Sequence, residues 1–153
     1  MNTFEKIDSE VIHFTQKIGA PFARIAIFVV YFWFGILKLF GESPANDLVK
    51  TLLAETLPFI TFEQFIMILG VYEMLIGIVF LFPRLERVAI LLLVPHLFVT
   101  TMPLILLPAI AWQSWFIPTL EGQYIIKNLL VVAVALGLAA HLNPVKPKIV
   151  MTK

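Results

Sequence analysis

The sequence contains no cysteine and has few charged side chains. The lack of cysteine excludes disulfide bonds, thiol nucleophiles and iron–sulfur ligation by this chain, and it leaves the redox compartment open. Charged residues make up only 14% of the chain and the net charge is +1, so no strongly basic surface is available for a nucleic acid. We therefore expect no nucleic-acid partner, and any redox role requires a cofactor carried by another molecule.

Histidines and cofactor motifs are also scarce. The three histidines are His13, His96 and His141. A membrane b-type haem needs two histidines at matching depth on facing helices, but His96 falls inside an apolar run while the other two lie near the ends of such runs. The sequence has no phosphate-binding loop, dinucleotide-binding fingerprint or nucleophile elbow. These absences predict no metal site and no intrinsic cofactor.

Apolar residues dominate what is present. They make up 60% of the chain, and the mean hydropathy is +0.95. Four runs are long enough for helices that cross a hydrocarbon core of about 30 Å. The sequence therefore predicts an all-α integral membrane four-helix bundle, formed by a single membrane domain over 1–153. The spans are expected at about 21–40, 59–82, 88–107 and 123–142.

Three further segments are expected at the membrane surface. Residues 1–18 carry apolar side chains at helical spacing among polar ones, which predicts an amphipathic helix in the cytoplasmic interface. Residues 44–57 predict a second amphipathic helix on the outer side, which packs on the surface or acts as a lid over an outward-facing pocket. Residues 108–122 contain Trp112 and Trp115 between prolines, which favours an interfacial or partly re-entrant segment.

The distribution of cations predicts the orientation. The second span ends at Pro83 and is followed by Arg84 and Arg87, while Arg24 is expected to reach the same interface from the first span. With both termini in the cytoplasm, the outer loops hold only Lys50. The cytoplasmic side then holds Lys6, Lys17, Arg24, Arg84, Arg87, Lys146, Lys148 and Lys153. We therefore expect a multi-pass protein of the inner (plasma) membrane with both termini in the cytoplasm.

Two ionisable residues are expected near the middle of the bundle. Glu73 is the only charged residue between Phe65 and Phe82, and it follows Gly70 closely enough to share the face on which Gly70 and Gly77 predict a helix-packing seam. His96 falls at nearly the same depth on the next span. A buried ionisable residue in a membrane is costly and often functional. A Glu73–His96 pair and two separate packing residues are both open, with Tyr72, Thr100 and Thr101 as available hydroxyl partners.

A second polar layer is expected nearer the outer surface. Lys38 lies near the end of the first span, one turn after Gly35, and is expected to find a counter-ion on a neighbouring helix. By depth, the layer comprises two cations and two anions that neutralise one another. Its members are Lys38, Glu63, Glu121 and Lys127.

Short motifs resemble those of the DoxX-like superfamily of small four-helix membrane proteins, in its YkgB/RclC-like branch. They are FWFGILKLFGE in the first predicted span, GVYEMLIGIVFLFPR in the second and EGQYIIKNLLVVAVAL in the fourth. The matching positions are Gly35 and Lys38, Glu73 and Gly77, and Glu121, Gly122 and Lys127. The resemblance implies a link to membrane redox chemistry, as in a subunit of thiosulfate:quinone oxidoreductase, or to oxidative and reactive-chlorine stress.

These observations leave three functional hypotheses. The first is a DoxX-like accessory subunit, without enzymatic activity of its own, whose intrabundle pocket binds a quinone-like or small anionic ligand. The residues of that pocket would be Lys38, Glu73, His96, Glu121 and Lys127. The second is a small proton-coupled transporter in which Glu73 and His96 take up protons and Pro95 and Pro103 act as hinges. The third is a membrane assembly module. Expected partners are the lipid bilayer, a membrane redox protein and a second copy of the chain.

Overall fold

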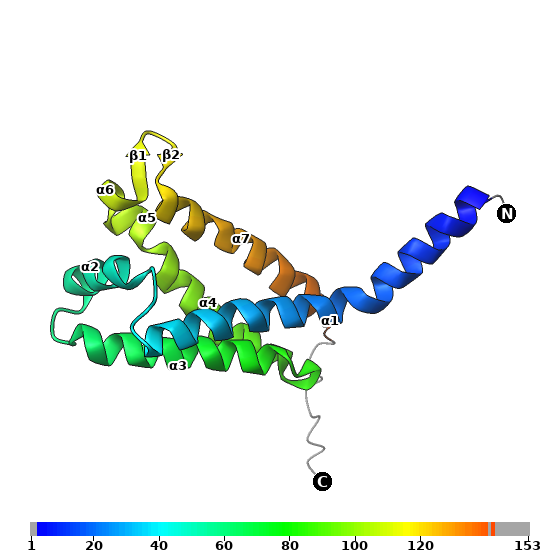
Figure 1. Ribbon diagram of the computed structural model, residues 1–153, viewed down its shortest axis with the longest axis horizontal. Helices are drawn as coiled ribbons and strands as arrows, with labels where there is room; N and C mark the ends of the chain where they lie inside the picture. The colour runs from blue at the N-terminus through cyan, green and yellow to red at the C-terminus, as the bar shows by residue number, and fades with distance from the viewer. Residues whose placement is uncertain (1–2, 141, 143–153) are drawn as a thin grey trace, which may run out of the picture.

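The computed structural model of the protein describes residues 3–140 and Leu142, so the predicted tail cations Lys146, Lys148 and Lys153, and His141, lie outside the described residues. Within the described residues, four helical segments are long and apolar enough to cross a membrane. They are α1 (Thr3–Leu39), α3 (Phe62–Phe80), α4 (Glu86–Thr101) together with the short helices at its two ends, and α7 (Leu120–Ala139). The predicted helical class is therefore confirmed (Figure 1).

The first helix is longer than the sequence predicts. We expected a separate interfacial helix over 1–18 and a span from about residue 21, but α1 is one helix of 37 residues with Pro21 inside it. A proline has no backbone N–H, so it removes one hydrogen bond of the helix and bends it. The helix can still continue through the proline when its other hydrogen bonds and packing contacts are kept. Figure 1 shows that α1 is bent and that its N-terminal part leaves the bundle.

Helices α1 and α3 form the closest pair in the bundle, and glycines make the approach possible. A Cβ atom added at Gly35 would lie 2.6 Å from the carbonyl oxygen of Gly70, and one added at Gly70 would lie 2.8 Å from that of Gly35. Gly77 meets the backbone of Phe28 and Phe32 at 3.1 Å in the same way. The predicted packing seam is confirmed, because two helix backbones at this separation leave no room for side chains.

The amphipathic helix α2 (Asn46–Thr56) connects α1 to α3, and its buried residues are Leu52 and Leu53. After α3, the 3-10 turn η1 (Pro83–Leu85) leads into α4. Pro95 lies inside α4, whereas Pro103 begins the separate short helix α5 (Pro103–Leu106). We call the end of the bundle that contains η1 the η1 end, and the opposite end, which contains α2 and a β-hairpin at residues 112–118, the hairpin end.

A small β-hairpin stands where an interfacial or re-entrant segment was expected. After α6 (Pro108–Ala111), strand β1 (Trp112–Ser114) pairs antiparallel with β2 (Ile117–Pro118). Phe116 has φ of 55° in the connection. The sequence did not predict these strands because segments this short carry no apolar alternation that could be recognised.

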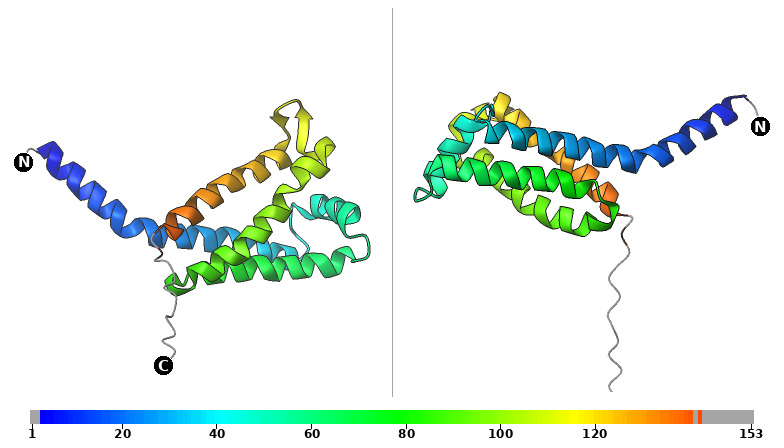
Figure 2. Two further views of the ribbon diagram at one scale, coloured as in Figure 1. Left: turned by 180° about the vertical axis from the view of Figure 1, so that it is seen from behind. Right: turned by 60° about the horizontal axis from the view of Figure 1, so that its bottom comes forward.

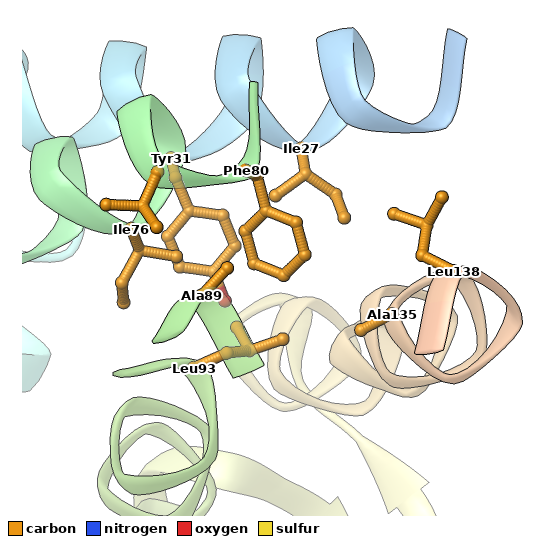
Figure 3. Close-up of a cluster of buried hydrophobic side chains, with 9 residues drawn as sticks. Ile27, Tyr31, Ile76, Phe80, Ala89, Leu93, Ala135 and Leu138 are labelled. Carbon is orange, nitrogen blue, oxygen red and sulfur yellow. The ribbon is translucent and has the colours of Figure 1, made fainter. Parts of the chain in front are cut away.

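The core lies where all four long helices meet toward the η1 end. Figure 3 shows side chains of α1, α3, α4 and α7 converging there. The cluster comprises Ile27, Tyr31, Ile76, Val79, Phe80, Ala89, Leu93, Ala135 and Leu138. Toward the hairpin end, α4 diverges from α3, and α2 lies at the open side of this divergence (Figures 1 and 2).

The outward faces of the long helices are apolar. Trp33 on α1, Ile68 on α3, Leu91 on α4 and Leu129 on α7 are each more than half exposed, at 62%, 66%, 73% and 68%. Soluble monomers rarely expose contiguous apolar surface of this kind. The fold therefore indicates a multi-pass helical membrane protein.

Candidate functional site

Three ionisable side chains from three helices meet inside the bundle. Lys38 Nζ of α1 lies 2.6 Å from Glu73 Oε2 of α3, and Glu73 Oε1 lies 3.0 Å from His96 Nε2 of α4. Of the two alternatives that the sequence left open for Glu73 and His96, the structure shows the pair, and it confirms the expectation that Lys38 finds a counter-ion on a neighbouring helix. We call these three residues the polar cluster.

The polar cluster is closed off from its surroundings. Lys38, Glu73 and His96 are 6%, 5% and 7% exposed. An ammonium and a carboxylate at this distance neutralise each other, which is what permits two charged groups to remain in an apolar interior. Each oxygen of the Glu73 carboxylate has its own donor, because Lys38 and His96 approach different oxygen atoms.

Tyr31 extends the cluster along α1. Its hydroxyl lies 3.4 Å from His96 Nδ1, and its ring meets the imidazole edge-on with centroids 5.1 Å apart. A carboxylate only accepts hydrogen bonds, so the arrangement that satisfies every group has Nε2–H donating to Glu73 and the Tyr31 hydroxyl donating to Nδ1. This residue was not among the predicted site residues, since a tyrosine in an apolar helix has no distinguishing pattern.

Lys38 does not belong to the outer layer in which the sequence places it. Side chains on a helix point back toward the helix N-terminus. Because α1 runs toward the hairpin end, Lys38 near its last turn points back into the bundle and reaches the level of Glu73. Gly70 makes room for it, since a Cβ atom added there would lie 3.1 Å from Lys38 Cβ.

Because side chains point toward the helix N-terminus, the Lys127 side chain points away from the polar cluster. Helix α7 starts at the hairpin end, so the Lys127 side chain points back toward that end and lies over the Tyr124 ring, 4.8 Å from its centroid. Lys127, Glu121 and Glu63 are all exposed. The structure therefore brings together Lys38, Glu73 and His96 among the predicted site residues and leaves Glu121 and Lys127 on the surface.

The hydroxyl groups expected beside Glu73 and His96 bond elsewhere. Tyr72 donates to the carbonyl of Leu92 at 2.7 Å, next to the interruption at Pro95. Thr100 and Thr101 both donate to the carbonyl of Leu97. Threonines in membrane helices commonly bond back to their own helix, which is why sequence position did not identify their partners.

A second, partly buried ion pair lies at the η1 end. Arg24 Nη2 of α1 donates to Glu86 Oε1 at the start of α4, and the two side chains are 14% and 7% exposed. The sequence predicts Arg24 as an interfacial anchor and does not identify Glu86 as its partner. This pairing is a correction: Arg24 points back along α1 as expected, but α4 begins at that level and supplies a carboxylate.

The chemistry open to the polar cluster is charge pairing and hydrogen bonding. A lysine ammonium has three donors, of which two face Glu73 and, at 3.5 Å, the Phe34 carbonyl. Among residues 3–140 and Leu142, no group of three or more carboxylate or imidazole side chains is arranged to hold a metal ion.

The fold and the polar cluster together indicate a multi-pass helical membrane protein with a buried, charge-balanced site. Comparison with protein-family models, with curated proteins and with solved structures finds no match.

Proposed function

We propose that this protein is an accessory subunit of the bacterial inner membrane, with both termini in the cytoplasm, whose polar cluster binds the polar group of a quinone-like or small anionic ligand. The observation that carries the proposal is the meeting of Lys38, Glu73 and His96 from three helices. Ionisable residues inside a membrane protein are costly to bury and are usually retained for binding or transport.

The chain's composition supports an accessory role. It has no cysteine, so electrons would have to be carried by the ligand or by a partner protein. The resemblance of its motifs to those of DoxX-like proteins points to the same kind of redox-linked role. Within this proposal, Lys38 supplies the cation that attracts an oxygen atom of the ligand, and Glu73 holds Lys38 in place until the ligand binds.

The content of bound ligand tests this proposal. The protein would be purified in mild detergent, extracted with organic solvent and examined for quinones by optical spectroscopy. The native protein should retain a quinone, and Lys38→Met and Glu73→Gln should lower the amount at least about tenfold, since a hydrogen bond to a charged group is worth about 1.5–3 kcal/mol. Glu63→Gln, on an exposed carboxyl of the same helix, is the control. Equal content in all four proteins would reject the proposal.

The proposed orientation rests on the cations. Lys6, Lys17, Arg24, Arg84 and Arg87 belong to the η1 side of the chain, while Lys50 lies in the connection at the hairpin end. Because the chain has no cysteine, single Glu42→Cys and Leu85→Cys variants report the two ends without background. An impermeant maleimide should label Glu42→Cys in intact spheroplasts and Leu85→Cys only after lysis. The reverse pattern would overturn the orientation.

A proton-coupled transporter is the second candidate, and one observation favours it. Pro95 interrupts the α4 hydrogen-bond ladder immediately before His96, so α4 has a point of bending at the polar cluster. Proton flux into liposomes under an imposed potential would be measured for the native protein, Glu73→Gln and Glu63→Gln. Flux lost only in Glu73→Gln would support transport. No effect of Glu73→Gln on either flux or ligand content would leave the assembly module as the remaining hypothesis.

A further inference from the structure

A cavity of about 250 Å³ lies between α2 and the diverging hairpin-end halves of α3 and α4. Helix α2 forms one wall, Phe65 of α3 forms another, and α4 contributes Val99 together with Met102 at its C-terminal end. The complete lining is Val49, Leu52, Leu53, Thr56, Leu57, Phe65, Val99 and Met102.

The lining offers almost nothing to a polar ligand. Seven of its eight side chains are apolar, and the hydroxyl of Thr56 already donates to the carbonyl of Leu52 at 2.7 Å. A polar group placed here would lose its hydrogen bonds to water without replacement. An engineered apolar cavity of about 150 Å³ in another protein stays free of water and binds benzene, so a larger cavity of the same character suits a hydrocarbon group.

We propose that this cavity binds a hydrocarbon chain of a membrane lipid, with α2 as its cover. The outward faces of α1, α3, α4 and α7 are apolar, so lipid chains are the hydrocarbon at highest concentration around the bundle. Helix α2 turns Leu52 and Leu53 toward the bundle and keeps Asp47, Lys50 and Glu55 exposed, as expected of a helix that separates hydrocarbon from water. Met102 adds a side chain that adapts to irregular occupants.

This site is separate from the polar cluster. Val99 follows His96 by one turn of α4, about 4.5 Å along the helix axis, and none of the cavity residues belongs to the cluster. The inference therefore does not depend on the proposed ligand of Lys38, Glu73 and His96, and either proposal can fail alone.

Photolabelling in nanodiscs tests the inference. The probe is a phospholipid with a diazirine in its acyl chain, and labelled residues are located by mass spectrometry. Leu52 and Leu53 are 9% and 5% exposed, so surface contact with lipid does not reach them. We expect label on both residues in the native protein. Label confined to exposed residues such as Phe98, with none on Leu52 or Leu53, would overturn the inference without need of any variant.

A matched pair of substitutions on α4 adds a control. Val99→Phe places a larger side chain in the cavity and should lower labelling of Leu52 and Leu53 at least about fivefold. Val94→Phe makes the same change at a position that is 59% exposed and should leave labelling unchanged. Circular dichroism would verify that both variants are helical. Equal labelling in two folded variants would contradict the inference.

A second arm distinguishes the source of the hydrocarbon. The free probe 3-(trifluoromethyl)-3-phenyldiazirine is a compact apolar molecule that dissolves in bilayers without being part of a lipid. Labelling of Leu53 by the phospholipid probe supports a lipid chain as the occupant. Labelling of Leu53 by the free probe alone would reject the lipid chain and assign the cavity to a small apolar molecule.

Discussion

Lys38 near the end of α1 and Glu73 in the middle of α3 form an ion pair with 2.6 Å between Nζ and Oε2, with side chains only 6% and 7% exposed. The desolvation of both charges is a cost that the pair recovers only while both partners are present. The two residues therefore depend on each other, and a change to one alone leaves a buried charge without compensation. Several testable properties of the protein depend on contacts of this type.

The two single substitutions in the Lys38–Glu73 pair should together lower the free energy of unfolding by more than the double substitution does. Breaking a buried pair from one side costs about 3–5 kcal/mol, so Glu73→Gln and Lys38→Met should each lower the free energy of unfolding by about that amount. The double variant should lose much less than the sum. Unfolding in mixed micelles, followed by circular dichroism, gives all three values. An additive double variant would mean that the two charges are not coupled.

A methyl group at Gly70 should force α1 and α3 apart. The added Cβ atom would lie 2.8 Å from the Gly35 carbonyl oxygen, and overpacking of this kind typically costs about 1–3 kcal/mol. Gly137→Ala is the control, since a Cβ atom there meets nothing within 4 Å. Gly70→Ala should lower the midpoint of unfolding while Gly137→Ala leaves it unchanged or raises it. Equal midpoints would contradict the close packing of the two helices.

Gly122 should be required for the contact between α7 and the hairpin-end turn. A Cβ atom added at Gly122 would overlap the Ala111 carbonyl oxygen, which also accepts a hydrogen bond from the backbone N–H of Thr119. Gly122→Ala should therefore displace the hairpin and change the fluorescence of Trp112 and Trp115. The measurement is best made in a Trp33→Phe background, because Trp33 belongs to α1 and would add its own emission to that of the hairpin tryptophans. An unchanged emission spectrum would refute this contact.

The ion pair of Arg24 and Glu86 should hold α1 to α4 at the η1 end. Glu86→Gln leaves Arg24, whose side chain is only 14% exposed in the native protein, without its carboxylate, so we expect a loss of about 3–5 kcal/mol in unfolding free energy. Arg24→Leu combined with Glu86→Leu should restore most of that loss. Arg84→Gln, at an exposed position in η1, should have no measurable effect. A tolerated Glu86→Gln would show that the pair contributes little.

The sequence predicted the depth of the ionisable residues in the membrane, but it did not predict which of their side chains are in contact. The matching levels of Glu73 and His96 follow from counting residues on two spans joined by a tight turn, whereas their contact was left open by the sequence and is shown only by the structure. For Lys38 and Lys127, depth alone was misleading. The direction of the helix decides whether a side chain points into the bundle or toward its end, and these two helices run in opposite directions.

The pairing of Arg24 with Glu86 and the hairpin after α6 illustrate a second limit. Glu86 is the first residue of α4 and directly follows a short turn, and nothing in its spacing distinguishes it from the exposed Arg84 two residues earlier. The hairpin depends on Thr119, which caps α7 and donates to the Ile110 carbonyl at 2.6 Å. Both features require elements distant in sequence to be placed first.

The amino-acid order alone dictated the long apolar helices, the helix-packing glycines of α3 and the scarcity of internal charge, because lipid-compatible helices need length, hydropathy and internally bonded backbone. Tertiary packing decided which ionisable groups share a carboxylate, since a distance of 2.6 Å depends on helix direction, on the room left by Gly70 and on how closely α1 approaches α3. None of these three quantities is a property of any single segment.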